Sequence, residues 1–278
     1  MIAAELHCHS TFSKGTKIQV EGLHSPEELL EQAEKIGLDV LAFTDHDCFE
    51  GAEQALKLQK KFNVLVLPGE EVTTKKGHLL CLGIQEKIPA NLSVEESIDL
   101  VHEQGGIAIA PHPFDIEGKG IKVEALKADA IEVFNALNLD RFANRKASQF
   151  AKQENLPTVL GSDAHCKEMI GLAINNIKAE KDVDAILKAI KKGNVEVKQK
   201  KYVPTKILQN WSVQRLKTSN QYVKNYINKH YSFPKKQISK AMLKLVDFSP
   251  GKIDYFFTSI TYLGLGSAII YSAIKNLT

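Results

Sequence analysis

Six of the nine histidines in this 278-residue chain follow short apolar runs. They lie in the fragments His7-Cys8-His9, Thr44-Asp45-His46-Asp47, Gly77-His78, Pro111-His112-Pro113 and Gly161-Ser162-Asp163-Ala164-His165. A carboxylate, Glu71, has a similar position in Pro68-Gly69-Glu70-Glu71-Val72. Imidazoles and carboxylates are ligands of divalent transition metals, and this set is large enough for two or three ions. We therefore predict a hydrolase with a multinuclear metal site.

The histidine fragments differ in what each one indicates. His7 and His9 are two residues apart, so on a strand both imidazoles point to the same side and can share an ion. In the second fragment we take His46 as the ligand, with Asp45 and Asp47 as residues that orient an imidazole.

The remaining fragments supply a bridge and a fixed imidazole. Glu70 and Glu71 adjoin each other, so only one is expected to face the site, where a carboxylate can bridge two cations. Pro111 and Pro113 restrict the backbone around His112, which helps to hold a ligand in place.

Short apolar runs alternate with amphipathic stretches through residues 1–199 and predict the elements that position these side chains. The runs are rich in Val, Ile, Leu and Ala, as is typical of strands covered on both faces, and span residues 2–6, 39–44, 64–67, 79–84, 107–110, 130–134 and 158–160. Helices are predicted within residues 25–37, 51–62, 93–105, 141–155 and 182–192, the first and third with capping boxes. Parallel strands joined by helical crossovers place their carboxyl ends on one face. The ligand fragments should therefore converge, on a barrel or a strongly curled sheet.

Charge divides the chain into two parts. Residues 1–199 hold 23 Lys+Arg and 31 Asp+Glu, whereas residues 200–278 hold 13 and 2. We therefore predict a hydrolase domain at 1–199, a basic, mainly helical extension at 200–252 and an apolar C-terminal helix at 253–278. The basic stretch, with Trp211, Tyr222, Tyr226 and Tyr231, could bind nucleic acid by phosphate contacts and stacking, or could be a set of ordinary amphipathic helices.

Residues 255–274 contain no charge and no proline. A helix of that length spans about 30 Å, the thickness of the apolar core of a bilayer. Its serines and threonines make it only moderately apolar, so a helix packed on the barrel or on a second subunit is the alternative to a membrane anchor.

Four cysteines lie within three residues of proposed ligands: Cys8, Cys48, Cys81 and Cys166. None forms a Cys-x-x-Cys pair, so we expect reduced, small hydrophobic side chains rather than metal ligands. Cleavage of an N-terminal signal would remove His7 and His9, so we expect a cytoplasmic protein. If the C-terminal segment is a membrane anchor, the protein would be attached to the cytoplasmic side of a membrane.

The metal-ligand fragments together make residues 1 to about 170 resemble the PHP superfamily of polymerase-linked and histidinol-phosphatase-like hydrolases. The resemblance implies a distorted (βα)7 barrel whose strand-end face binds two or three ions. It assigns His7, His9, Glu71 and Asp163 to a first ion, Glu71, His78 and His112 to a second, and His46 and His165 to a third. The pattern Gly-x-Glu-Val selects Glu71 over Glu70.

One fragment departs from the family pattern. The chain has Ser13-Lys14-Gly15 where the family commonly reads Ser-Asp-Gly, and a cationic Lys cannot be a metal ligand. The third ion site is then weakened, completed by another residue, or partly replaced by the Lys14 ammonium acting on a substrate phosphate.

These features predict hydrolysis of a phosphate mono- or diester in a small metabolite, a nucleotide or a short RNA. Two bridged Mn²⁺, Zn²⁺ or Fe²⁺ ions would lower the pKa of a shared water from about 16 towards 7 and give a hydroxide nucleophile. His46 or His165 could protonate the leaving oxygen, and Lys14 and Arg141 could clamp the phosphate.

The sequence leaves two rival functions open. Amide or other acyl hydrolysis at the same ions is the first rival, since a metal hydroxide also attacks carbonyl groups. The second is a non-catalytic or nuclease-type nucleic-acid-binding module that uses the basic extension. The oligomeric state is not predicted.

Overall fold

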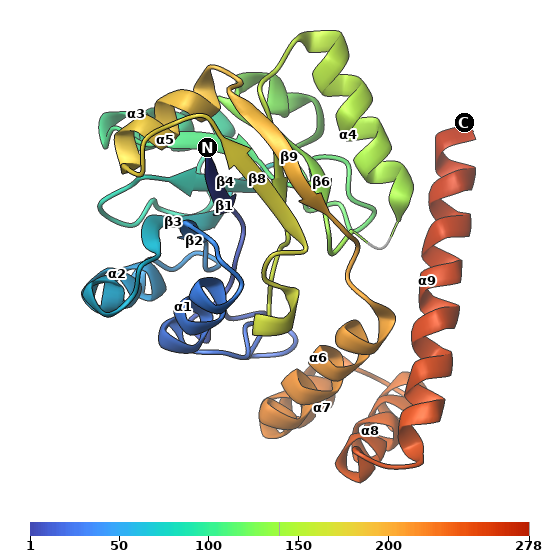
Figure 1. Ribbon diagram of the computed structural model, residues 1–278. Coiled ribbons are helices and arrows are strands. Elements are labelled where there is room, and N and C mark those ends of the chain that lie inside the picture. The colour runs from blue at the N-terminus through green and yellow to red at the C-terminus, as the bar shows by residue number, and fades with distance from the viewer. Residues whose placement is uncertain (139, 278) are drawn as a thin grey trace.

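The computed structural model describes residues 1–138 and 140–277, and nine strands in this part of the chain form one sheet (Figure 1). The strands are β1 (Ile2–Glu5), β2 (Val40–Phe43), β3 (Leu65–Thr73), β4 (His78–Leu82), β5 (Ile107–Ala110), β6 (Ala130–Asn135), β7 (Thr158–Gly161), β8 (Ala173–Ile177) and β9 (Val195–Lys200). Their order across the sheet is β7-β6-β5-β4-β3-β2-β1-β8-β9.

The sheet curls until β7 lies beside β8. The buried Asn175 side chain of β8 joins them: its amide donates to the Leu160 carbonyl of β7 (2.7 Å), and its Oδ1 accepts from the Leu160 N–H (2.9 Å). One side chain thus takes the place of a backbone ladder and nearly closes a barrel.

The strand directions are mixed rather than purely parallel. β4 runs antiparallel to both β3 and β5, and β8 runs antiparallel to β1 and β9. The turn at residues 74–77 between β3 and β4 is too short for a helical crossover, which needs a dozen or more residues, so the chain turns back. The predicted barrel-like α/β fold is confirmed in this coarse form. A strict (βα)7 repeat is not, and β8 and β9 were not predicted.

The helices of the barrel part match the sequence prediction. They are α1 (Pro26–Lys35), α2 (Glu50–Leu58), α3 (Val94–Glu103), α4 (Arg141–Glu154) and α5 (Val183–Lys191), with short 3-10 turns η1 (Gln59–Lys61), η2 (Lys122–Lys127) and η3 (Lys167–Met169). Both capping boxes are present: Ser25 pairs with Glu28, and Ser93 pairs with Glu96. These caps satisfy N–H groups of the first turn, which fixes where each helix begins.

The basic C-terminal part is helical. It forms α6 (Thr205–Thr218), α7 (Asn220–His230), α8 (Lys235–Leu245), the turn η4 (Val246–Phe248) and α9 (Ile253–Leu277). Trp211 of α6 is only 7% exposed, and its indole N–H donates to the Glu21 carbonyl in the barrel (2.8 Å). Trp211 therefore docks α6 on the barrel and is too buried to stack on a nucleic-acid base, which was one of the two roles that the sequence left open.

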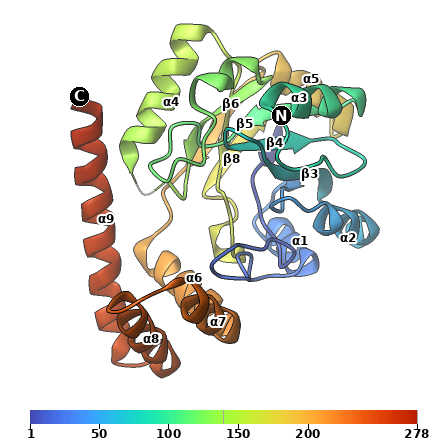
Figure 2. The same cartoon turned by 180° about the vertical axis from the view of Figure 1, so that it is seen from behind.

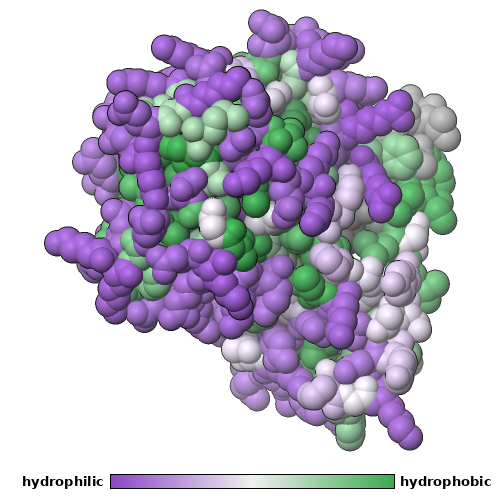
Figure 3. Space-filling view, viewed as in Figure 1, coloured by the Kyte–Doolittle hydropathy of each residue, from purple (hydrophilic) through white to green (hydrophobic). Residues whose placement is uncertain are grey.

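α9 runs beside the barrel from α6 at one end to α4 at the other (Figures 1 and 2). Thr258 donates to Gln209 of α6 (2.6 Å), and Ser272 donates to the Asp140 carboxylate that caps α4 (2.7 Å). Residues Ile253–Ser272 are long and apolar enough to span a membrane, with mean hydropathy 1.3 and 6% of the stretch buried. Apolar side chains accordingly gather at the right-hand edge of Figure 3, over α9. The helix thus packs on the protein through Phe257, Leu265 and a few polar side chains, and leaves most of its apolar surface exposed.

Candidate metal centre

The ends of six strands bring together all eight predicted metal ligands. His7 and His9 follow β1, His46 follows β2, His112 follows β5, and Asp163 and His165 follow β7. Glu71 lies near the end of β3, and His78 lies at the start of β4. Because β4 is antiparallel to β3, its start meets the end of β3, so His78 joins the same cluster. Their donor atoms form four groups that could each hold an ion: His7, Glu71 and His112; His7, His9 and Asp163; His46, Glu71 and His78; and His9, His46 and His165.

The fully buried Glu71 carboxylate is the centre of the cluster. Its Oε1 lies 2.8 Å from His78 Nδ1 and 3.0 Å from His112 Nε2. Its Oε2 lies 3.1 Å from His46 Nδ1, 3.3 Å from His9 Nε2 and 3.4 Å from His7 Nε2. Burial alone would raise the pKa of Glu71, but the charges of the surrounding imidazoles outweigh burial and hold that pKa well below its usual range. A carboxylate among five imidazoles is the geometry of a bridge.

Glu70 points away from the cluster. One of its carboxylate oxygens accepts from the Ile88 N–H, and the other is buried without a hydrogen-bond partner among the described residues. Burial raises the pKa of Glu70 to about 7. Of the two neighbouring glutamates, the structure thus places Glu71 in the site.

Asp163 provides a second carboxylate. Its Oδ1 lies 3.2 Å from His9 Nε2 and 3.4 Å from His7 Nε2, and these two imidazole nitrogens lie 3.1 Å apart. Burial opposes protonation of both imidazoles, yet the adjacent carboxylates raise the pKa of His9 to about 9 and hold that of His7 well above its usual range. Nitrogens and carboxylates that converge this closely in a buried site fit a divalent cation between them.

Hydrogen bonds from outside the cluster orient its imidazoles. His7 Nδ1 lies 3.0 Å from Glu132 Oε1, and His9 Nδ1 lies 2.9 Å from Ser13 Oγ. With Nδ1 engaged, Nε2 of each ring faces the cluster and is the candidate ligand atom. Glu132 also accepts from the His112 N–H (2.8 Å) and from the Asn135 amide (2.9 Å), which in turn donates to Asp163. Glu132 therefore fixes three of the ligands.

Neither Glu132 nor Ser13 was singled out in the sequence. Glu132 could have been found from the sequence, because it is the one charged residue in an otherwise apolar run. A carboxylate buried in a strand needs a hydrogen-bond or charge partner. Asp45 and Asp47, predicted to orient an imidazole, make no direct hydrogen bond to one in the described part of the chain. Asp45 accepts from the Ser10 N–H and hydroxyl, and Asp47 accepts from the Thr73 N–H and hydroxyl. They brace the loops that carry the ligands.

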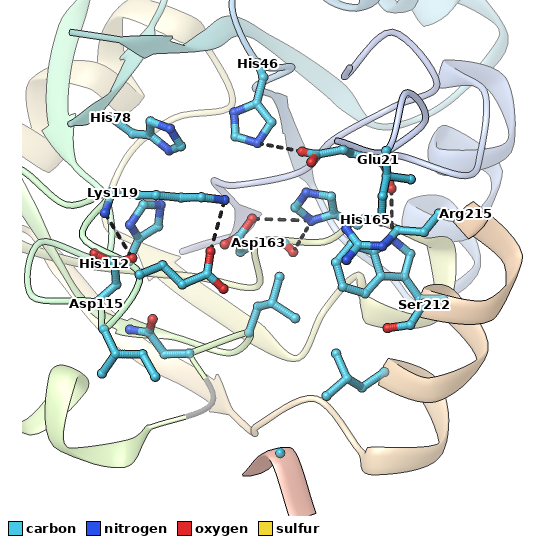
Figure 4. Close-up of a pocket in the computed structure, with 18 of the residues that line it drawn as sticks. Glu21, His46, His78, His112, Asp115, Lys119, Asp163, His165, Ser212 and Arg215 are labelled. Carbon is cyan, nitrogen blue, oxygen red and sulfur yellow. Dashed lines mark hydrogen bonds and ion pairs between the residues drawn. The ribbon is translucent and has the colours of Figure 1, made fainter. Parts of the chain in front are cut away.

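The third group of donors gains a carboxylate that the sequence did not identify. Glu21 Oε2 lies 3.3 Å from His46 Nε2, on the side where His46 and His165 meet (Figure 4). Burial opposes ionisation of Glu21, but the hydrogen bond and charge of His46 lower its pKa to about 2. Burial, together with the charge of His9, lowers the pKa of His165 to about 3, so this imidazole is neutral. Lys14, at the position of the missing family ligand, is exposed.

Six of the eight candidate ligands, all but His7 and His9, form the floor of a cavity of about 560 Å³ (Figure 4). Lys119 and Arg215 line it with positive charge, and the Arg215 guanidinium stacks on Trp211 at 4.0 Å. Trp211 in turn contacts His165, with ring centroids 5.0 Å apart. The Arg215 Nε is buried and has no hydrogen-bond partner in the described part of the chain. α6 therefore contributes a cation to the cavity, which the sequence division at residue 199 did not predict.

The two predicted phosphate clamps lie elsewhere. Lys14 and Arg141 are both exposed, and neither lines the cavity. The Arg141 guanidinium lies over the Tyr202 ring at 5.1 Å. The cysteines are free: Cys8, Cys81 and Cys166 are buried, and none belongs to the donor groups found among the described residues.

A barrel-like α/β sheet with buried histidines and carboxylates at its strand ends defines a class, the metal-dependent hydrolases built on such barrels. A family model described as PHP-associated matches residues 141–195. The chain is 39% identical over 150 residues to the uncharacterized protein MJ1587 of Methanocaldococcus jannaschii, covering 52% of this chain and 88% of the relative. It is 38% identical over 92 residues to a phosphoribosyl 1,2-cyclic phosphate 1,2-diphosphodiesterase of Eggerthella lenta, covering 31% and 32% of the two chains. The protein belongs to the PHP superfamily.

Two solved structures share the fold. PsfC from Pseudomonas syringae aligns with a TM-score of 0.50 at 17% identity, over 81% of this chain and 98% of its own. An amidohydrolase from Chromobacterium violaceum aligns with the same score and identity, over 70% and 97%.

Proposed function

We propose that this protein is a phosphoesterase that hydrolyses phosphate mono- or diesters at a cluster of divalent metal ions. The observation that carries the proposal is the Glu71 carboxylate, which five imidazoles surround on the floor of a cavity that also contains Lys119 and Arg215. Relatives support the reaction class. The Eggerthella lenta relative is a phosphodiesterase by name, and a 5'-3' exoribonuclease of Haemophilus influenzae is 30% identical over 109 residues.

The donor groups suggest how ions would be held. His7, His9 and Asp163 would hold one, Glu71 would bridge to a second held with His78 and His112, and His46 and His165 would hold a third. Ions bound there would supply a water of lowered pKa and positive charge beside the phosphoryl oxygens.

The remaining polar groups would bind and orient the phosphate. Arg215 presents a planar, permanently charged donor array that matches phosphate geometry, and stacking on Trp211 fixes its plane. Lys119 pairs with Glu117 at 3.2 Å on the opposite wall and can exchange that partner for a phosphate oxygen. These two residues take the role that the sequence gave to Lys14 and Arg141.

The hydrogen bonds of His165 favour a ligand role over the general-acid role. Its Nδ1 lies 2.9 Å from the Asp163 carbonyl oxygen, which can only accept, so Nδ1 carries the proton. Nε2 then has a free lone pair for an ion. His46 has a carboxylate at each ring nitrogen, Glu71 at Nδ1 and Glu21 at Nε2, which also suits a ligand.

The direct test is hydrolysis by metal-loaded protein of nitrophenyl phosphate, bis(nitrophenyl) phosphate and nitrophenyl acetate, each with Mn²⁺, Zn²⁺ or Fe²⁺. We expect turnover of at least one phosphate ester and loss of this turnover in Asp163→Asn. The substitution removes the carboxylate that would bind an ion together with His7 and His9. Turnover of the acetate alone would favour acyl hydrolysis and overturn the proposal.

Glu21 is proposed to complete the third ion site in place of the missing aspartate. Glu21→Gln is expected to lower the bound metal by one ion per chain in mass spectrometry of the purified protein, while the other ions stay. Glu117→Gln is the matched control, because Glu117 lines the same cavity but pairs with Lys119. Equal metal content in the two variants would rule out Glu21 as a ligand.

A further inference from the structure

A second cavity, of about 520 Å³, lies among the C-terminal helices. We call it the apolar groove. Side chains of α6, α7, α8 and α9 line it, and most are apolar, among them Val213, Leu216, Val223, Ile227, Leu243 and Phe257. A cavity with so few polar groups suits a hydrocarbon ligand rather than a polar one.

The apolar groove adjoins the metal cavity. Four residues line both: Lys17 and Ile18 from the loop after β1, Ser212 from α6 and Thr261 from α9. The wall that α6 and α9 give to the metal cavity is also apolar, with Leu208 of α6 and Leu265 of α9. A ligand with its phosphate at the metal ligands could therefore extend an apolar chain between α6 and α9 into the groove.

We infer that the substrate is a phosphate ester that carries a long hydrocarbon chain, with the phosphate at the metal centre and the chain in the apolar groove. This inference rests on the proposed phosphoesterase function and adds the substrate class. Transfer of a methylene group from water into an apolar cavity improves affinity about fourfold. The groove thus gives a long-chain ester an advantage that a nucleotide or a sugar phosphate cannot gain there.

The outer surface of α9 supports a substrate of this kind independently. Tyr255, Leu263 and Ile270 are 80%, 70% and 63% exposed, while Thr261 on the same helix borders both cavities. Exposed lysines lie on α7 and α8, two of the helices that line the groove, for example Lys224 and Lys235. A helix that borders the substrate path and also presents apolar side chains outward suits an enzyme that takes an amphiphile from a lipid surface.

The test compares short and long chains on the metal-loaded full-length protein. Calorimetric binding of butylphosphonate and decylphosphonate, below micelle-forming concentrations, measures the groove without turnover. We expect decylphosphonate to bind at least tenfold more tightly, and decyl phosphate to be hydrolysed with at least tenfold higher kcat/KM than butyl phosphate.

Ser239 of α8 lines the groove away from the metal cavity, so Ser239→Trp should fill it. We expect this variant to lose the preference for decyl chains and to treat butyl compounds as the wild type does. Ser239→Phe adds less bulk and guards against misfolding, and Gln237→Trp, on the exposed side of α8, is the matched control.

The outcomes separate the two proposals. Equal affinity for both phosphonates, or a preference unchanged in both Ser239 variants, would overturn the inference whether or not esters are hydrolysed. Tighter binding of decylphosphonate without hydrolysis of any phosphate ester would keep the groove as a chain-binding site and overturn the phosphoesterase function instead.

Discussion

Glu71→Gln is expected to release at least one ion per chain and to lower phosphoesterase kcat roughly a thousandfold or more. Both carboxylate oxygens of Glu71 face imidazoles, so the side chain belongs to two of the donor groups at once. An amide keeps the shape but loses the negative charge, and its NH₂ group points a donor at atoms that need an acceptor. Loss of the bridge should therefore weaken the binding of two ions together. Substitution of a ligand that holds a single ion should weaken the binding of that ion only.

Glu70→Gln is the matched control for this experiment. It is the same substitution one residue earlier, on a side chain that contacts the Ile88 backbone and no predicted ligand. We expect wild-type metal content and activity. Metal content would be measured by mass spectrometry and activity with the phosphate ester that turns over best. Two ions bound to Glu71→Gln with normal affinity would show that Glu71 is not a bridge.

Arg215→Met is expected to lower kcat/KM for phosphate esters about 100- to 1000-fold without changing the metal content. Arg215 is largely buried in the cavity wall, stacks on Trp211 and leaves its Nε without a partner, so its charge is available to a bound anion. A fixed cation beside the phosphoryl oxygens stabilises charge that grows in the transition state, and removal of one such group commonly has an effect of this size. Methionine keeps the unbranched aliphatic part of the side chain and removes the guanidinium.

Arg215→Lys should recover only part of the loss, because an ammonium cannot donate two parallel hydrogen bonds or stack as a plane. Arg145→Met, on the exposed surface of α4, controls for loss of one positive charge. The expected pattern is normal activity in Arg145→Met, intermediate in Arg215→Lys and low in Arg215→Met. Equal activity in all three would show that Arg215 does not contact the substrate.

Local sequence was sufficient for much of the barrel part. The capping pairs Ser25 with Glu28 and Ser93 with Glu96 predicted two helices, because the residues of a capping box interact within a single turn. The strands that carry the ligands were also predicted, since buried strands need unbroken apolar runs. The direction of β4 was not, because the periodicity of an apolar run is the same for parallel and antiparallel strands.

Residues that act through distant neighbours escaped prediction. Glu21 lies in the loop between β1 and α1, whose path is set by contacts with the C-terminal helices: Trp211 donates to the Glu21 carbonyl, and the Ser219 hydroxyl accepts from the Val20 N–H at 2.9 Å. Nothing near Glu21 in the sequence records those contacts. Lys14, by contrast, occupies the family position yet is turned to solvent.

By itself, the sequence determined the chemistry of the candidate ligands, because the histidines and carboxylates lie at strand ends and these ends meet on one face of the sheet. Only the tertiary structure decided what surrounds that chemistry. The helices after residue 200 dock on the mouth of the barrel, bring Trp211 and Arg215 to the cavity of the candidate ligands and place an apolar groove beside it. The physical reason is that a strand end fixes a side chain through local backbone geometry, whereas docking depends on surfaces that match only after each part has folded.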